Sequence, residues 1–121
     1  METSQESLSE RRAEARLGGG ADRIERQHAK GKQTARERLE ALLDPGTFSE
    51  IGMFVQHRAT GFGMEDRKPW GDGVVTGCGE IAGRLVYVFA QDFTVLGGSV
   101  GEAHGRKIAR VMDLALEPGA A

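Results

Sequence analysis

The stretch Leu85-Val86-Tyr87-Val88-Phe89-Ala90 decides the fold of this chain, because every one of its positions is hydrophobic. A strand with one exposed face alternates between apolar and polar side chains, whereas a strand buried on both faces is apolar throughout. The stretch therefore predicts a strand inside a covered sheet. Gly97-Gly98 and a helical pattern follow it, so the order strand, turn, helix predicts an α/β protein.

A second strand is predicted directly upstream, over residues 74–81. Ala82-Gly83 is a two-residue connection between it and the strand at 84–90, so the pair is predicted to form a β-hairpin. Gly77 and Gly79 lie inside the first strand, where glycine indicates a bulge or a close neighbour.

A capped helix is predicted downstream of the apolar strand. Ser99 and Glu102 have the spacing of a capping box, and Pro118-Gly119 ends the pattern. The helix has an apolar stripe formed by Val100, Ala103, Ile108, Val111, Met112 and Ala115. Such a helix normally leads to another strand of the same sheet, and only Ala120 and Ala121 follow here. We therefore expect an incomplete domain.

The N-terminal part of the chain is predicted to be helical. Residues 1–17 are charged with a thin apolar stripe, and Gly18-Gly19-Gly20 then predicts a flexible joint. A second helix is expected from residue 21 to about residue 30, with Gly31 as its stop.

A third helix is the best defined of these. Thr34 and Glu37 form a T-x-x-E capping box, and Asp44-Pro45-Gly46 ends the helix. Its apolar face is formed by Ala35, Leu39, Leu42 and Leu43. The pattern then changes: 48–55 predicts one or two short strands interrupted at Gly52, and the glycine-rich residues 56–73 predict a loop. We therefore divide the chain into a helical arm, 1–46, and an α/β region, 47–121.

Composition limits the classes of function. The 121 residues carry a net charge of −2, which excludes a generally basic nucleic-acid binder. Cys78 is the single cysteine, so no internal disulfide can form, and we expect it to be a small buried residue. The chain shows neither the basic start and apolar run of a signal peptide nor a membrane-spanning length of apolar residues. A cytoplasmic protein is predicted.

A basic window between residues 23 and 38 is the first candidate binding site. It holds six cationic side chains against two glutamates, a balance of +4: Arg23, Arg26, Lys30, Lys32, Arg36 and Arg38. Lysines beside the start of a helix suit phosphate groups, because point charges and backbone amides act together there. A solvated face, or arginines that pair with carboxylates of a neighbouring subunit, would explain the same pattern.

Other motifs are weak signals. Residues 77–82 match G-x-G-x-x-A, but a strand follows them instead of a helix, which excludes a dinucleotide-binding turn. The three histidines have no metal-ligand spacing, so we expect surface or hydrogen-bonding roles for His28, His57 and His104. Asp92 is expected to orient loops or to accept hydrogen bonds from backbone amides, and Trp70 is expected to be a packing anchor.

Several segments in a fixed order resemble one family. They are residues 30–38 (K-G-K-Q-T-A-R-E-R), 57–64 (H-R-A-T-G-F-G-M), 71–77 (G-D-G-V-V-T-G), 83–89 (G-R-L-V-Y-V-F) and 91–99 (Q-D-F-T-V-L-G-G-S). Together they resemble the start of the carboxyltransferase (β) subunit of biotin-dependent acyl-CoA carboxylases, with propionyl-CoA carboxylase β chains as nearest kin. Departures are Leu96, where an aromatic is frequent, and Cys78 and Glu80, where basic residues are common.

The resemblance implies a fold and a function. It implies the first strands and helix of a crotonase-like spiral, and transfer of a carboxyl group from carboxybiotin to the α-carbon of an acyl-CoA such as propionyl-CoA. It places Lys30, Lys32 and Arg36 close to the coenzyme A phosphates, Arg38 in a structural role, and Gly97-Gly98 at an architectural turn. It implies partners as well: a biotin carboxylase with its biotin carboxyl carrier, and further copies of the carboxyltransferase subunit. No catalytic residue is assigned, because the family's oxyanion sites lie downstream.

Two other classes stay open at this point. One is a crotonase-type acyl-CoA hydratase or hydrolase, and the other is a non-enzymatic phosphate- or RNA-binding module that uses the basic window. The segments at 30–38 and 91–99 argue against the hydratase, and steep salt dependence of oligonucleotide binding would indicate the RNA module. On the carboxyltransferase interpretation we expect residues 1–121 alone to be inactive in catalysis.

Overall fold

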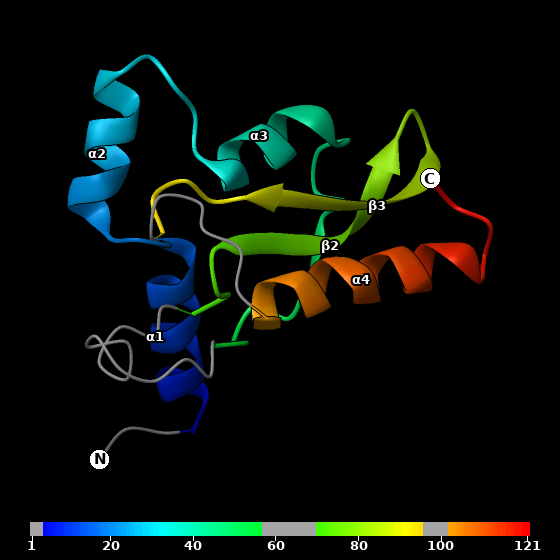
Figure 1. Ribbon diagram of the computed structural model, residues 1–121, viewed down its shortest axis with the longest axis horizontal. Helices are drawn as coiled ribbons and strands as arrows, with labels where there is room; N and C mark the ends of the chain where they lie inside the picture. Colours follow the sequence, from blue (N-terminus) through cyan, green and yellow to red (C-terminus); the bar gives the residue numbers. More distant parts are fainter. Residues whose placement is uncertain (1–3, 57–69, 96–101) are drawn as a thin grey trace.

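The computed structural model describes residues 4–56, 70–95 and 102–121. Three helices come first, α1 (Ser4–Arg16), α2 (Ala21–Ala29) and α3 (Ala35–Leu42). Three strands follow, β1 (Ser49–Ile51), β2 (Val74–Ile81) and β3 (Arg84–Gln91), and then the helix α4 (Glu102–Leu116). The strands form one antiparallel sheet in the order β1-β2-β3, with α3 over one face and α4 over the other (Figure 1). The predicted α/β class is therefore confirmed.

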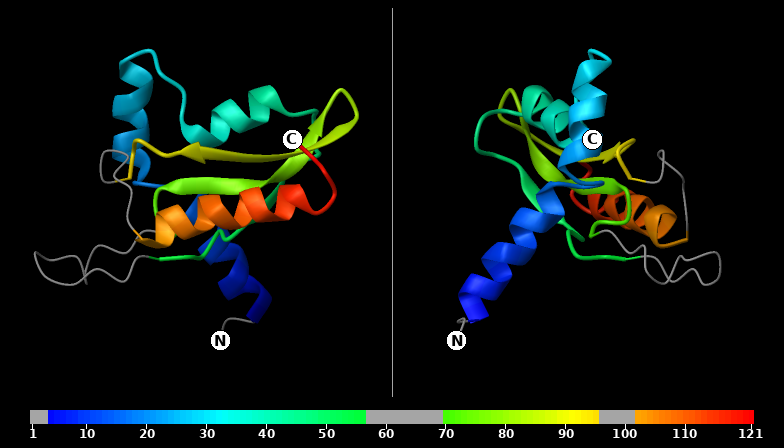
Figure 2. Two further views of the ribbon diagram at one scale, coloured as in Figure 1. Left: turned by 45° about the vertical axis from the view of Figure 1, so that its right-hand side comes forward. Right: turned by 90° about the vertical axis from the view of Figure 1, so that its left-hand side faces the viewer.

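The helices of the arm differ in whether they pack against the sheet. Helix α1 projects away from it, whereas α3 packs on it (Figure 2). The division of the chain at residues 46 and 47 stays a prediction. In the part of the chain that the structure describes, no helix is long and apolar enough to cross a membrane.

The middle strand β2 packs closely against its neighbours because two of its residues are glycines. All eight residues of β2 pair with β3, from Val74 opposite Gln91 to Ile81 opposite Arg84. A Cβ atom on Gly77 would overlap the Ser49 carbonyl of β1, and one on Gly79 would lie 2.8 Å from Leu43 Cδ1. A bulge and a close neighbour were the two predicted explanations for these glycines, and the close neighbour is the one found.

The hairpin turn at Ala82-Gly83 is confirmed. Both residues have positive φ, 51° and 77°, as a two-residue turn of the primed type requires. Alanine is unfavourable at positive φ, but the Asp44 carboxylate accepts hydrogen bonds from the backbone amides of Ala82 (3.1 Å) and Gly83 (2.9 Å). The loop after α3 therefore stabilises a turn whose own sequence is poor.

The expectation that the apolar strand is buried on both faces is wrong for this structure. Leu85 and Phe89 of β3 are 46% and 43% exposed. The physical reason is that β3 is the edge strand, which α3 and α4 cover only in part. Ala121 reaches its outer edge and accepts a hydrogen bond from the Tyr87 amide (2.6 Å). The core cluster lies between α3 and β2 and consists of Ala35, Leu39 and Val75, packed by Phe48, Val88 and Ala90.

The glycines after α1 form a tight contact and not the predicted flexible joint. The Gly19 amide donates to Thr94 Oγ1 (3.1 Å), and a Cβ atom on Gly19 would overlap the Thr94 carbonyl. Arg23 also donates to that carbonyl, at 3.4 Å. Close backbone approach, and not chain freedom, explains glycine here.

The apolar stripes of α3 and α4 are confirmed only in part. Leu42 and Met112 were expected to be buried, and both are exposed. Leu42 is the last residue of α3 and is 54% exposed, whereas the next residue, Leu43, is buried. Val111 is buried as predicted, and the other buried residues of α4 are His104 and Lys107. Ser99, Val100 and Gly97-Gly98 lie outside the described residues.

Candidate functional site

The loop between α2 and α3 carries the two lysines of the candidate site. Gln27 is buried and holds this loop from both sides: its Nε2 donates to the Gln33 carbonyl (3.2 Å), and its own carbonyl accepts from the Lys32 amide (3.2 Å). Gly31 provides the positive φ of 74° that the turn needs. Lys30 and Lys32 are exposed on this braced turn. Their charges therefore face solvent from a defined position.

The start of α3 is capped as predicted. The Thr34 amide donates to Glu37 Oε1 (2.9 Å), and the Glu37 amide donates to Thr34 Oγ1 (3.2 Å). His28 Nε2 lies 2.6 Å from the same carboxylate oxygen. These hydrogen bonds, that of His28 first, lower the pKa of Glu37 to about 2. Two amides of the helix start are thus satisfied within the chain, so a bound anion would depend mainly on the lysine charges.

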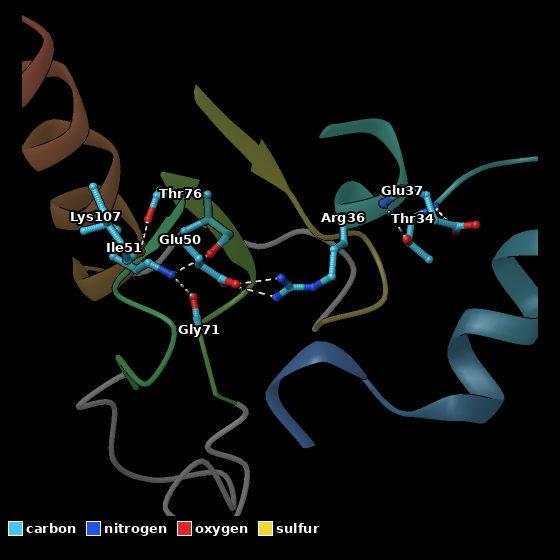
Figure 3. A network of polar contacts seen from close by, with 9 residues as sticks. Thr34, Arg36, Glu37, Glu50, Ile51, Gly71, Thr76 and Lys107 are labelled. Carbon is cyan, nitrogen blue, oxygen red and sulfur yellow. Dashed lines mark hydrogen bonds and ion pairs between the residues drawn. The ribbon is translucent and has the colours of Figure 1, made fainter. Parts of the chain in front are cut away.

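Arg36 extends from α3 toward β1 and forms an ion pair there. Its guanidinium donates twice to the Glu50 carboxylate, at 2.6 and 3.1 Å, and joins α3 to β1 (Figure 3). Both side chains are largely buried. An arginine–carboxylate pair was expected with a neighbouring subunit, whereas the carboxylate here belongs to the same chain. The contact of Arg36 with coenzyme A stays a prediction, and its charge is already matched.

A groove lies between the lysine loop, the start of α3 and the end of β3. It has a volume of about 410 Å³ and is lined by Gln27, Lys32, Gln33, Ala35, Arg38, Gln91 and Phe93. Lys32 Nζ lies 5.9 Å from the centroid of the Phe93 ring, which is 57% exposed. Arg38, expected to be structural, is exposed at this groove. Sequence analysis did not single out Phe93, although an aromatic residue just after a buried-type strand was the available signal.

A buried polar cluster holds α4 against the turn before β2. Lys107 Nζ donates to the carbonyls of Gly71 (2.8 Å) and Val74 (2.6 Å), and His104 Nδ1 lies 2.9 Å from the Asp72 carbonyl. Burial, opposed by the charges of Glu50 and Asp72, lowers the pKa of Lys107 to about 8. Lysine and histidine count as polar in a hydrophobic pattern, so periodicity missed both residues.

The cluster reaches the groove through Gln91. His104 Nε2 lies 3.4 Å from Gln91 Nε2, and Gln91 is the last residue of β3. His104 is fully buried. It is thus a hydrogen-bonding histidine, one of the two roles expected for it, and it positions one wall of the groove.

The weaker candidates have structural roles where they are described. Asp92 accepts from the Thr94 amide (2.9 Å), as expected, and Trp70 packs edge-to-face on Phe54 with centroids 5.5 Å apart. Cys78 is only half-buried. His57 lies outside the described residues. Within residues 4–56, 70–95 and 102–121, no group of three or more His, Cys, Asp or Glu side chains could hold a metal ion.

The fold and the groove together define a class. A hairpin sheet between two helices carries, at the end of β3, a groove with cationic and amide side chains. Such a lining fits an anionic ligand at the edge of an α/β domain. The chain belongs to the carboxyl transferase domain family, which it matches over residues 26–121.

Similar proteins agree with this assignment. The chain is 64% identical over 115 residues to the propionyl-CoA carboxylase beta chain of Roseobacter denitrificans. The matched residues cover 95% of this chain and 22% of that protein. It is 56% identical over 115 residues to the methylmalonyl-CoA decarboxylase subunit alpha of Veillonella parvula, covering 95% and 23%. Among solved structures, the transcarboxylase 12S hexamer with methylmalonyl-coenzyme A and methylmalonic acid bound has a TM-score of 0.93. That match has 50% identity and covers 98% of this chain and 24% of the other.

The structural match confirms the predicted part of a crotonase-like carboxyltransferase fold. The chain spans less than a quarter of the length of these relatives. It therefore corresponds to one section of such an enzyme.

Proposed function

We propose that this chain is the N-terminal section of an acyl-CoA carboxyltransferase that moves a carboxyl group between carboxybiotin and the α-carbon of an acyl-CoA such as propionyl-CoA. The family match over residues 26–121 carries this proposal. It is supported by the identity to a propionyl-CoA carboxylase beta chain and by the likeness to a transcarboxylase solved with methylmalonyl-coenzyme A.

The role of this section is to bind the phosphate groups of the acyl-CoA. Lys30 and Lys32 are exposed on a braced loop beside the groove, and Arg38 lies at the same groove. Each charge-assisted hydrogen bond would contribute ~1.5–3 kcal/mol, less where water screens it. Arg36 remains a third candidate, but it would have to leave Glu50 to act.

The chemistry of transfer is assigned to none of the described residues. Carboxybiotin would supply the carboxyl group, and backbone amides of the family's downstream segments would stabilise the thioester enolate and the ureido oxygen. None of the described side chains is assigned to the ureido ring. A biotin carboxylase with its carrier, further copies of the carboxyltransferase subunit and a cytoplasmic location belong to this proposal.

The reverse direction is the second candidate. The 56% identity to a methylmalonyl-CoA decarboxylase subunit favours an enzyme in which the carboxyl group leaves the acyl-CoA. Family membership disfavours both the hydratase or hydrolase and the RNA-binding module.

A chimera tests the function. This sequence would replace the matching 115 residues of the Roseobacter denitrificans beta chain, and carboxylation of propionyl-CoA would be measured with that enzyme's own biotin-carrying partner. We expect turnover within about tenfold of the parent enzyme, since a tenfold loss corresponds to only ~1.4 kcal/mol. A correctly assembled chimera without turnover would contradict the proposal.

The phosphate site is tested in the same chimera with Lys32→Ala and with Lys30→Ala. Either change should raise the Kd for coenzyme A about tenfold, because one charge-assisted contact is lost. Arg106→Gln is the matched control, since Arg106 is an exposed cation on α4, on the other face of the sheet. Unchanged affinity for both coenzyme A and dephospho-coenzyme A in the lysine variants would show that the loop is only structural.

A further inference from the structure

Phe93 is an exposed aromatic residue on a turn that is held from several sides. The Asp92 amide donates to the Gly73 carbonyl (2.7 Å), and the Val95 amide donates to the Asp92 carbonyl (3.1 Å). The Asp92 carboxylate accepts from both the amide and the hydroxyl of Thr94. Thr94 and Val95 are buried, yet 57% of Phe93 between them and Asp92 is exposed. The fold thus presents this ring to solvent from a fixed backbone.

The surroundings of the ring are polar and cationic. The groove beside it contains the side chains of Lys32, Arg38 and Gln33, and Ala35 is its only other apolar lining residue among those described. Lys32 Nζ lies at 5.9 Å from the ring centroid. An acyl chain would need a mostly apolar lining, whereas one aromatic face beside cations suits a planar base that carries phosphate.

We propose that Phe93 is the platform on which the adenine ring of the acyl-CoA lies, with Lys32 beside it at the 3′-phosphate. This inference rests on the proposed coenzyme A site. Every base has a π-face, so stacking on Phe93 adds affinity without requiring a charge. The groove volume of about 410 Å³ lies in the ~300–1,000 Å³ range of small-molecule sites.

The proposal separates the two halves of the ligand. Phe93 would act on the adenosine half alone, so a substrate without that half should not detect its loss. The matched substrates are propionyl-CoA and S-propionyl-4′-phosphopantetheine, which lacks the adenosine 3′,5′-bisphosphate portion. The variants are Phe93→Leu, which removes the π-face, and Phe93→Trp, which keeps one.

In the chimeric carboxyltransferase, Phe93→Leu should raise the KM for propionyl-CoA about tenfold, the usual scale of one stacking contact. The kcat and the KM for the shorter thioester should stay unchanged, and Phe93→Trp should restore the KM for propionyl-CoA. Equal KM values for propionyl-CoA in the parent and Phe93→Leu enzymes would overturn the proposal. So would an equal rise for both substrates, which would show a structural role.

Dephospho-coenzyme A distinguishes this inference from the phosphate site. Lys32→Ala should reduce the preference for coenzyme A over dephospho-coenzyme A, whereas Phe93→Leu should weaken both about equally. If only the lysine prediction fails, the placement of Lys32 at the 3′-phosphate is overturned, and the role of Phe93 as the adenine platform stands. If the chimera does not turn over, equilibrium dialysis with adenosine 3′,5′-bisphosphate decides: a Phe93→Leu Kd equal to that of the parent overturns the platform.

Discussion

Lys107 is a buried cation with two hydrogen bonds, one to the Gly71 carbonyl in the turn before β2 and one to the carbonyl of Val74, the first residue of β2. A neutral amine still has two hydrogens for these two acceptors. Burial makes the charged form costly, which explains the pKa of about 8 against an ordinary value of 10.5. The residue can therefore hold α4 in place with or without its charge.

The stability of the fold should depend on pH through this lysine. The unfolded chain keeps the proton up to about pH 10.5, and the folded chain releases it near pH 8. Because the unfolded state binds more protons in this window, the free energy of unfolding should rise with pH from 8 to 10.5, by up to ~3 kcal/mol. Urea denaturation of the unmodified chain and of the Lys107→Met variant across this pH range measures the change in the free energy of unfolding. The rise should disappear in the variant, and parallel pH profiles would contradict the prediction.

At the scale of elements, the contacts between segments distant in sequence set the geometry of the hairpin. Asp44 lies at the start of the loop after α3 and accepts hydrogen bonds from both amides of the turn between β2 and β3. Asp44→Ala should lower the free energy of unfolding by about 1–3 kcal/mol, because two hydrogen bonds to a carboxylate are lost at an unfavourable turn. Asp44→Asn, which keeps one acceptor oxygen, should lose less. Asp113→Ala on the exposed side of α4 is the control, expected within about 0.5 kcal/mol of the parent.

The joint between the arm and the sheet is the second element-scale contact. Gly19→Ala would push a methyl group against the Thr94 carbonyl, so we expect a loss of ~1–3 kcal/mol, the usual cost of overpacking. Gly105→Ala is the matched change, because Gly105 lies inside α4 with no atom near its missing side chain. That variant should gain up to ~1 kcal/mol from helix propensity. Thermal melts at one chain concentration compare them, and equal melting temperatures for the two variants would contradict close packing at Gly19.

For the whole molecule, the exposed edge strand determines how the chain behaves alone. β3 lies at the edge of the described sheet and leaves Leu85 and Phe89 exposed, and such an edge invites pairing with another chain. We expect residues 1–121 expressed alone to associate or aggregate and to show no carboxylation. A double variant with Leu85→Lys and Phe89→Lys should sediment as a monomer, since charges oppose edge pairing. A parent chain that sediments as a monomer would contradict the expectation, and turnover by it would move the active site into this section.

Sequence by itself determined the local structure. The T-x-x-E box predicted the start of α3, and Gly31 predicted the end of α2. The two-residue connection predicted the hairpin of β2 and β3. Each of these features depends only on residues a few positions apart. The ordered segments from 30 to 99 also identified the family, which the match over residues 26–121 confirms.

Tertiary structure alone decided which charges and surfaces are used. Arg36 looked like its neighbours Lys30 and Lys32 until Glu50, 14 residues away, proved to be its partner. The apolar stripe predicted for α4 included neither Lys107 nor His104, and only backbone carbonyls 32 to 36 residues away account for their burial. Phe93 and Lys32 come from separate segments and meet only at the groove. Burial and ion pairing depend on residues that the fold brings together from distant parts of the chain, so no local pattern contains them.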